Sequence, residues 1–128
     1  MVSLDSSFLI DLLAGDMRAI AKAQELDRTG EPRFITAPAA SEVLVGAYRL
    51  GGAYFTRTKT LVDNLPLLPF DRPSCHEAGR LGSELAARGT PLGQSDLYIA
   101  AITIRHGERL LTRDRGFVQV PGLTLEGY

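Results

Sequence analysis

The chain opens with Met1–Asp16, MVSLDSSFLIDLLAGD, in which a short apolar segment is followed by one acid and then by a helical pattern. Val2–Leu4 is typical of a buried strand, and it ends at Asp5. Ser6 or Ser7 can cap the helix that follows. This stretch therefore predicts a strand that leads through an acidic residue directly into a helix.

The rest of the chain continues this alternation. Apolar segments predict further strands at Arg33–Thr36, Leu65–Leu68, Arg109–Thr112 and Thr124–Leu125. Helical spacing of apolar residues predicts helices at Met17–Asp27, Pro38–Leu50, Ala53–Asn64, Pro73–Arg88 and Asp96–Arg105. The last of these is apolar almost all round, which is typical of a buried helix. The pattern predicts a single α/β domain with a mainly parallel sheet of four to five short strands and helices on both faces.

Composition limits the possible classes of protein. The 128 residues are 45% hydrophobic and 23% charged, which is typical of one globular domain. Cys75 is the only cysteine, so no internal disulfide is possible and a reducing compartment is expected; we also expect Cys75 to be a small core residue. The first residues lack a basic leader, and no apolar run approaches the roughly 20 residues of a membrane helix. These features predict a cytoplasmic protein without a membrane partner.

Three polar residues stand within two residues of the start of a predicted helix. They are Asp16, Asp71 and Ser95. Short polar side chains at such positions accept hydrogen bonds from the free backbone N–H groups of the first turn. We therefore expect each of them to act as a helix cap.

Four acids are placed where a parallel sheet can bring them together. Asp5 and Asp114 follow predicted strands, Asp96 opens a predicted helix, and Glu42 lies early in another. Strand ends and helix starts share one edge of such a sheet, and ligands bind beyond that edge. Each acid also has a simpler possible role, as a cap, a partner of the helix dipole or a turn residue. The joint pattern favours one shared site.

Grouped carboxylates repel one another, and a divalent cation relieves that repulsion. Hard oxygen ligands select Mg²⁺ or Mn²⁺, and the sequence has no Cys/His cluster for zinc. Such a cation can activate water for in-line hydrolysis of a phosphodiester, leaving a 5′-phosphate and a 3′-hydroxyl. The net charge of −1 argues weakly against nucleic acid, but twelve of the fourteen basic residues are arginines, which suit phosphate contacts.

Other chemistries find less support. A metal-free ribonuclease would need both histidines, His76 and His106, in one cleft. A phospho-acceptor domain would need a lysine on a late strand, but the only lysines are Lys22 and Lys59. No glycine pattern of a nucleotide-binding loop is present.

Four segments carry a family resemblance. Their sequences are LDSSFLIDLL at Leu4–Leu13, SEVLVGA at Ser41–Ala47, SDLYIAA at Ser95–Ala101 and LTRDRGF at Leu111–Phe117. They resemble the PIN domain, and their order and spacing resemble its VapC-type toxin branch. The resemblance spans nearly the whole chain and implies one PIN-like domain over residues 1–128.

The resemblance also implies roles for residues. The implied catalytic acids are Asp5, Glu42, Asp96 and Asp114. Asp5 and Asp96 would bind Mg²⁺ or Mn²⁺, with the other two acids acting directly or through water. Ser7 and Thr112 would be polar supports of the site. Arg113 and Arg115 flank the fourth acid, where they could contact RNA phosphate or pair with the acids themselves.

The implied function is that of a metal-dependent endoribonuclease, the toxin of a toxin–antitoxin pair. Members of this branch are typically homodimers that a small antitoxin protein holds inactive. The alternative is a catalytically silent scaffold of the same fold that binds RNA or a protein partner.

Overall fold

Five short strands form one sheet in the computed structural model, which describes residues 1–128. The strands are β1 (Val2–Leu4), β2 (Arg33–Thr36), β3 (Leu67–Leu68), β4 (Arg109–Leu111) and β5 (Thr124–Glu126). Their order across the sheet is β3-β2-β1-β4-β5, and every neighbouring pair is parallel. The predicted parallel sheet of four to five strands is confirmed.

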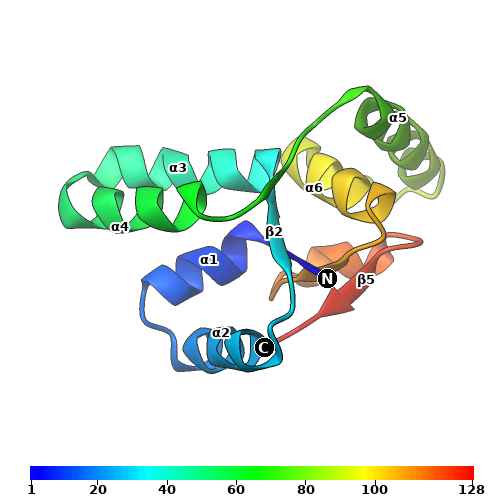
Figure 1. Ribbon diagram of the computed structural model, residues 1–128. Helices are drawn as coiled ribbons and strands as arrows, with labels where there is room; N and C mark the ends of the chain where they lie inside the picture. Colours follow the sequence, from blue (N-terminus) through cyan, green and yellow to red (C-terminus); the bar gives the residue numbers. More distant parts are fainter.

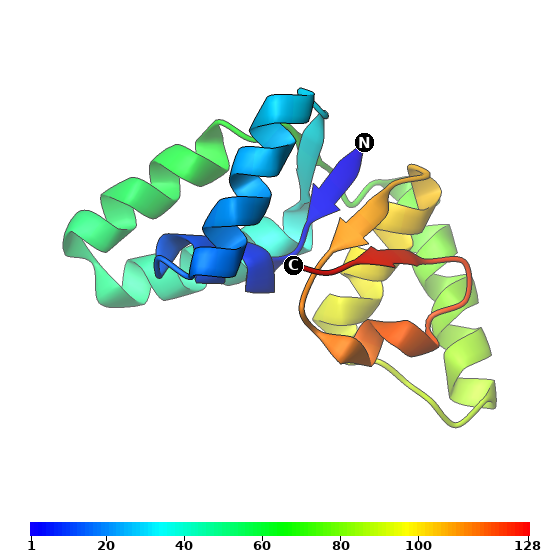
Figure 2. The same ribbon diagram turned by 90° about the horizontal axis from the view of Figure 1, so that it is seen from below.

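Six α-helices and one 3₁₀ helix connect and cover the strands. They are α1 (Ser6–Leu13), α2 (Met17–Thr29), α3 (Ala37–Leu50), α4 (Gly52–Asp63), α5 (Arg72–Ala87), α6 (Gln94–Arg105) and the 3₁₀ helix η1 (Arg115–Gln119). The central strands lie between α1 and α2 on one side and α5 and α6 on the other (Figure 2). Helices α3 and α4 pack together as a pair that extends away from the sheet (Figure 1). The prediction of helices on both faces is confirmed.

The strand order reverses between β1 and β4. The chain runs outward from β1 through β2 to β3, and then returns to add β4 and β5 on the other side of β1. Leu4 and Leu111 end these two central strands in register, and the backbone N–H of Asp5 donates to the carbonyl of Leu111 at 3.0 Å. In open parallel sheets the crevice at such a reversal is where ligands bind.

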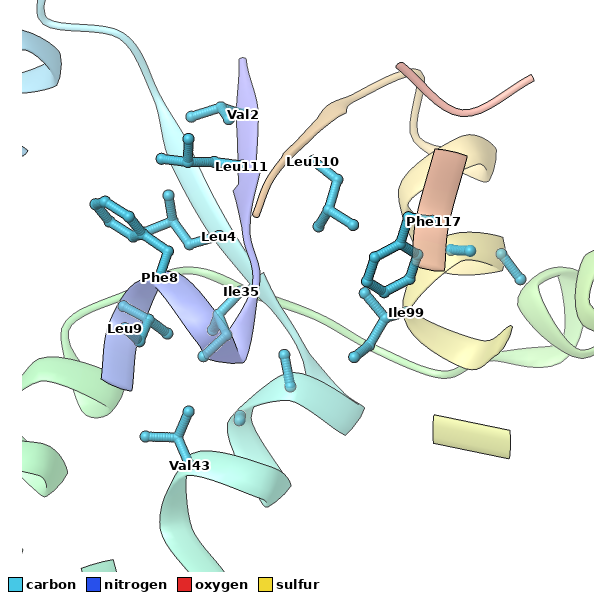
Figure 3. Packing of buried hydrophobic residues seen from close by; sticks show 14 of the residues in the cluster. Val2, Leu4, Phe8, Leu9, Ile35, Val43, Ile99, Leu110, Leu111 and Phe117 are labelled. Carbon is cyan, nitrogen blue, oxygen red and sulfur yellow. The ribbon is translucent and has the colours of Figure 1, made fainter. Parts of the chain in front are cut away.

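Both faces of the central strands are buried. In Figure 3 the adjacent residues of β4 point to opposite sides, Leu111 toward Phe8 and Leu110 toward Ile99 and Phe117. These five side chains are each at most 1% exposed, and so is Val2, which lies beside Leu111. Two-sided burial explains why β4 carries two successive leucines on opposite faces, without alternation. It also explains the predicted burial of α6, whose residues Ile99–Thr103 are buried.

The structure corrects three expectations from sequence. Asp16 and Asp71 do cap their helices, but Ser95 does not, because α6 begins two residues earlier than expected, at Gln94. Neither Ser6 nor Ser7 caps α1, since Asp5 holds the cap position without a side-chain cap bond. Cys75 is exposed, not buried in the core, because it lies on the outer side of α5.

No helix combines the length and apolar character needed to cross a membrane.

Candidate functional site

Asp5 is a buried carboxylate at the end of β1. Its side chain is only 3% exposed, and its Oδ2 accepts hydrogen bonds from Thr112 Oγ1 at 2.6 Å and Ser7 Oγ at 2.9 Å. Its other oxygen, Oδ1, is buried without a hydrogen-bond partner. A simple cap would point to the backbone N–H groups of α1, so the capping interpretation of Asp5 is wrong. The carboxylate is held from one side and leaves one oxygen for a ligand.

Glu42 is held by two serine hydroxyls from different helices. Ser6 Oγ, on α1, donates to Oε2 at 2.6 Å, and Ser95 Oγ, on α6, donates to Oε1. Glu42 itself lies on α3, so the two bonds tie three helices together beside the end of β1. This clamp fixes the direction of a half-buried carboxylate that is 36 and 53 residues away from its donors.

Asp96 is the acid with the largest electrostatic perturbation in the group. It lies in the first turn of α6, where the helix dipole favours a negative charge. Nevertheless, burial and then the charges of Asp114, Asp5 and Glu42 raise its pKa to about 6 from an ordinary value of 3.8. The three other acids are therefore close enough to act on it, and the structure brings all four to one edge of the sheet.

Asp114 has two roles in the structure. Its Oδ1 accepts a hydrogen bond from the Gly116 N–H at 2.8 Å, which caps η1, and its own N–H donates to Thr112 Oγ1 at 2.9 Å. The turn role considered from sequence is thus real. It coexists with the electrostatic role, because the same carboxylate is exposed and helps to raise the pKa of Asp96.

The donor set fits a hard divalent cation. Burial raises the pKa of Asp5 as well, although the hydrogen bonds from Thr112 and Ser7 oppose this effect. Raised carboxylate pKa values, together with an unpartnered buried oxygen on Asp5, mark a place where positive charge would be stabilising. No three of the chain's His, Cys, Asp or Glu side chains already meet around one point where they could hold a metal together. Direct ligation by two of the acids, with the others engaged elsewhere, is compatible with this geometry.

The two arginines beside Asp114 differ in their partners. Arg113 forms an ion pair with Asp11 of α1, with Nε 2.6 Å from Oδ2. The pairing of Arg113 with one of the four acids, which the sequence left open, is therefore wrong. Arg115 is exposed and forms no ion pair. The prediction that these arginines contact RNA stays a prediction.

Sequence reasoning missed two residues of this site, Ser6 and Ser95. The sequence pattern predicts both as helix caps, because serine before a helix is the usual signal for a cap. The available signal was their position, since each stands immediately beside one of the acids. Ser7 and Thr112, which were expected to support the site, both donate to Asp5.

Comparisons with known proteins agree on one protein family for this chain. The model of the PIN domain matches residues 2–123. A curated relative, the tRNA(fMet)-specific endonuclease VapC of Salmonella typhimurium strain LT2, is 31% identical over 68 residues. That alignment spans about half of each protein, namely 52% of this chain and 52% of the relative.

Solved structures share the fold at low sequence identity. A chain of the VapBC2 complex from Rickettsia felis, bound to a DNA fragment from its promoter, matches with a TM-score of 0.88 and 19% identity. The match covers 100% of this chain and 99% of that one. A chain of the DNA-bound VapBC of Salmonella typhimurium matches with a TM-score of 0.81 and 24% identity, covering 98% and 96%.

The hydrogen bond from Ser95 to Glu42 predicts that these two residues contribute jointly to the free energy of unfolding. Ser95→Ala should lower the free energy of unfolding by about 1 to 2 kcal/mol, because a partly buried carboxylate loses a donor. Urea denaturation measures the change. Ser41→Ala is the matched control, since Ser41 is exposed on the same helix as Glu42 and forms no side-chain hydrogen bond in the structure. In a Glu42→Gln background the cost of Ser95→Ala should shrink; an undiminished cost would assign Ser95 another role.

The raised pKa of Asp96 predicts that Asp96→Asn stabilises the protein when divalent ions are chelated. The unfolded chain ionises this group near 3.8 and the folded chain near 6, so stability of the native protein falls as pH rises between these values. Asparagine removes that cost. At pH 7.5 we expect a gain in Tm of about 2 °C, reduced from the full electrostatic effect by solvent screening.

The test is thermal unfolding in EDTA at two pH values. The advantage of Asp96→Asn should vanish near pH 4, where aspartate is protonated in the folded protein. A gain that is equal at both pH values, or a loss at pH 7.5, would contradict the electrostatic origin.

Proposed function

The chain belongs to the PIN-domain family, and from that premise we propose that it is an endoribonuclease that depends on Mg²⁺ or Mn²⁺. The observation that carries the proposal is the gathering of four acids at the strand-order reversal, with the pKa of Asp96 raised to about 6. Isolated surface acids have no such mutual influence. The group therefore has the charge and the position expected of a cation site.

Asp5 and Asp96 are the proposed direct ligands. Asp5 offers the buried, unpartnered Oδ1, and Asp96 has no hydrogen-bond donor that would compete for its oxygens. Glu42 and Asp114 contribute directly or through water, since each already accepts hydrogen bonds from the protein. When bound, the cation lowers the pKa of a coordinated water and stabilises charge on the phosphate oxygens.

The remaining residues orient this chemistry. Ser7 and Thr112 fix the Asp5 carboxylate from the side opposite to its free oxygen. Ser6 and Ser95 fix Glu42, so its charge acts at the site while its direction stays constant. Arg115, an exposed cation next to Asp114, is the arginine we propose for contact with RNA phosphate.

We propose further that the chain is the toxin of a toxin–antitoxin pair in the cytoplasm. The relative named an endonuclease and the fold shared with VapBC chains support this role. Helices α1, α2 and α3 expose large apolar side chains, which suit a small antitoxin or a second copy of the chain. They are Ile10, Met17, Val45, Tyr48 and Leu50.

A silent scaffold remains the second candidate, because no three side chains already form a ready ligand group. Calorimetric titration with Mn²⁺ separates the two hypotheses. The nuclease proposal predicts one or two binding events that Asp5→Asn weakens at least about tenfold, the lower range for loss of a residue at a metal site. Asp63→Asn, an exposed acid on α4, is the control and should bind normally. Absence of Mn²⁺ binding would favour the scaffold.

The central prediction concerns cleavage. With Mn²⁺ the purified protein should cut structured RNA, and tRNA(fMet) is the first substrate to try because the named relative acts on it. EDTA should stop the reaction, and Asp5→Asn and Asp96→Asn should each reduce it by at least about 100-fold. Asp63→Asn should leave it unchanged. End mapping should find 5′-phosphates; cutting that continues in EDTA, or in both site variants, would rule out this mechanism.

A further inference from the structure

A cavity adjoins the acid site on the side of Asp114. It has a volume of about 300 Å³, which is at the lower end of the range for small-ligand pockets. Its walls are the segment that follows β4, together with η1, and the last residues of the chain. The lining residues that matter here are Thr112–Arg115, Val118 and Leu125–Tyr128. Thr112 and Asp114 belong to both the cavity and the acid site.

The charged side chains of this cavity leave one cation free. Arg113 is neutralised by Asp11, which also accepts a hydrogen bond from the Tyr128 hydroxyl at 2.5 Å. Glu126 is neutralised in turn by Arg109 and Lys22, at 3.2 and 3.4 Å. Arg115 has no such partner. Arg115 is therefore the one guanidinium of the lining without an ion-pair partner, and its sequence neighbour Asp114 is the one carboxylate without one.

The apolar part of the lining is exposed as well. Val118 is 62% exposed although it lies beside the buried Phe117. The ring of Tyr128 is anchored edge-on to Phe8, with centroids 5.0 Å apart. Both apolar parts of the wall are thus held in place. The hydrogen bond to Asp11 holds Tyr128, and the 3₁₀ helix η1 holds Val118. A small aromatic or apolar group can lie against this surface without rearranging the fold.

We propose that this cavity binds one nucleotide of an unpaired RNA strand, next to the phosphate that is cut. The nucleotide's phosphate lies at Arg115 and its base against Val118 and Tyr128, because guanidinium groups bind phosphate and bases stack on apolar and aromatic side chains. A base that lies in this cavity cannot also be stacked and paired in a duplex, so the cavity favours an unpaired nucleotide. The inference rests on the proposed function, which it extends by giving the site a specificity pocket for single-stranded substrate.

The test is an NMR titration of the whole protein with adenosine 5′-monophosphate in EDTA, so neither metal nor cleavage takes part. Shifts should be confined to the amides of Arg113–Val118 and Gly127–Tyr128. Arg115→Gln should weaken binding about tenfold, and Val118→Ser about threefold. The matched controls are Arg72→Gln, also an exposed arginine without an ion pair, and Leu67→Ser, an apolar residue of β3 at 52% exposure; both should bind as the wild type does.

Three results would overturn the pocket. They are shifts centred elsewhere, no shifts at millimolar nucleotide, and equal shifts with inorganic phosphate, which would mean that the base makes no contact. The RNA cleavage assay is independent of this titration. Cleavage without nucleotide binding would remove the pocket alone, and nucleotide binding without cleavage would remove the nuclease proposal.

Discussion

The burial of the Asp5 carboxylate is the constraint on which the site depends. A charged group with 3% exposure is costly unless polar neighbours compensate for lost water. Two hydroxyls, from Thr112 and Ser7, compensate for one of its oxygens, and the other is buried without a hydrogen-bond partner. The fold accepts this cost at the point where β1 and β4 separate the two halves of the sheet. A buried carboxylate oxygen without a partner is expected where a protein is organised around a ligand.

The surrounding acids increase this cost and are therefore held by specific contacts. Glu42 would repel Asp5 and Asp96 from any position nearby, so its place has to be fixed by donors. Ser6 and Ser95 fix it, and they stand directly beside Asp5 and Asp96 in the sequence. The same two chain segments thus supply both the repelling charges and the hydroxyls that hold the third acid in place.

Much of the fold and the membership of the site could be predicted from sequence, because both follow from local patterns. Apolar runs marked the strands, and acids at strand ends and helix starts marked the edge of the sheet where they gather. Which group each side chain bonds could not be predicted. Ser95 changes from a cap to a donor because α6 starts two residues earlier than expected, and helix ends are the least determined part of any sequence pattern. The partner of Arg113 lies 102 residues away, on α1, where no local pattern indicates it.

The loop after β4 illustrates how neighbouring residues of one type acquire different roles. Arg113 and Arg115 flank Asp114 and have the same chemistry in sequence. Arg113 forms an ion pair with Asp11, and this pair joins the loop to α1. Asp114 caps η1, whose first residue is Arg115, and Arg115 lines the cavity without an ion-pair partner. The ion pair therefore does more than stabilise the loop. By neutralising one arginine and fixing the loop, it leaves the other as the single free cation beside the acids, where a polyanionic strand would be drawn to one side of the site.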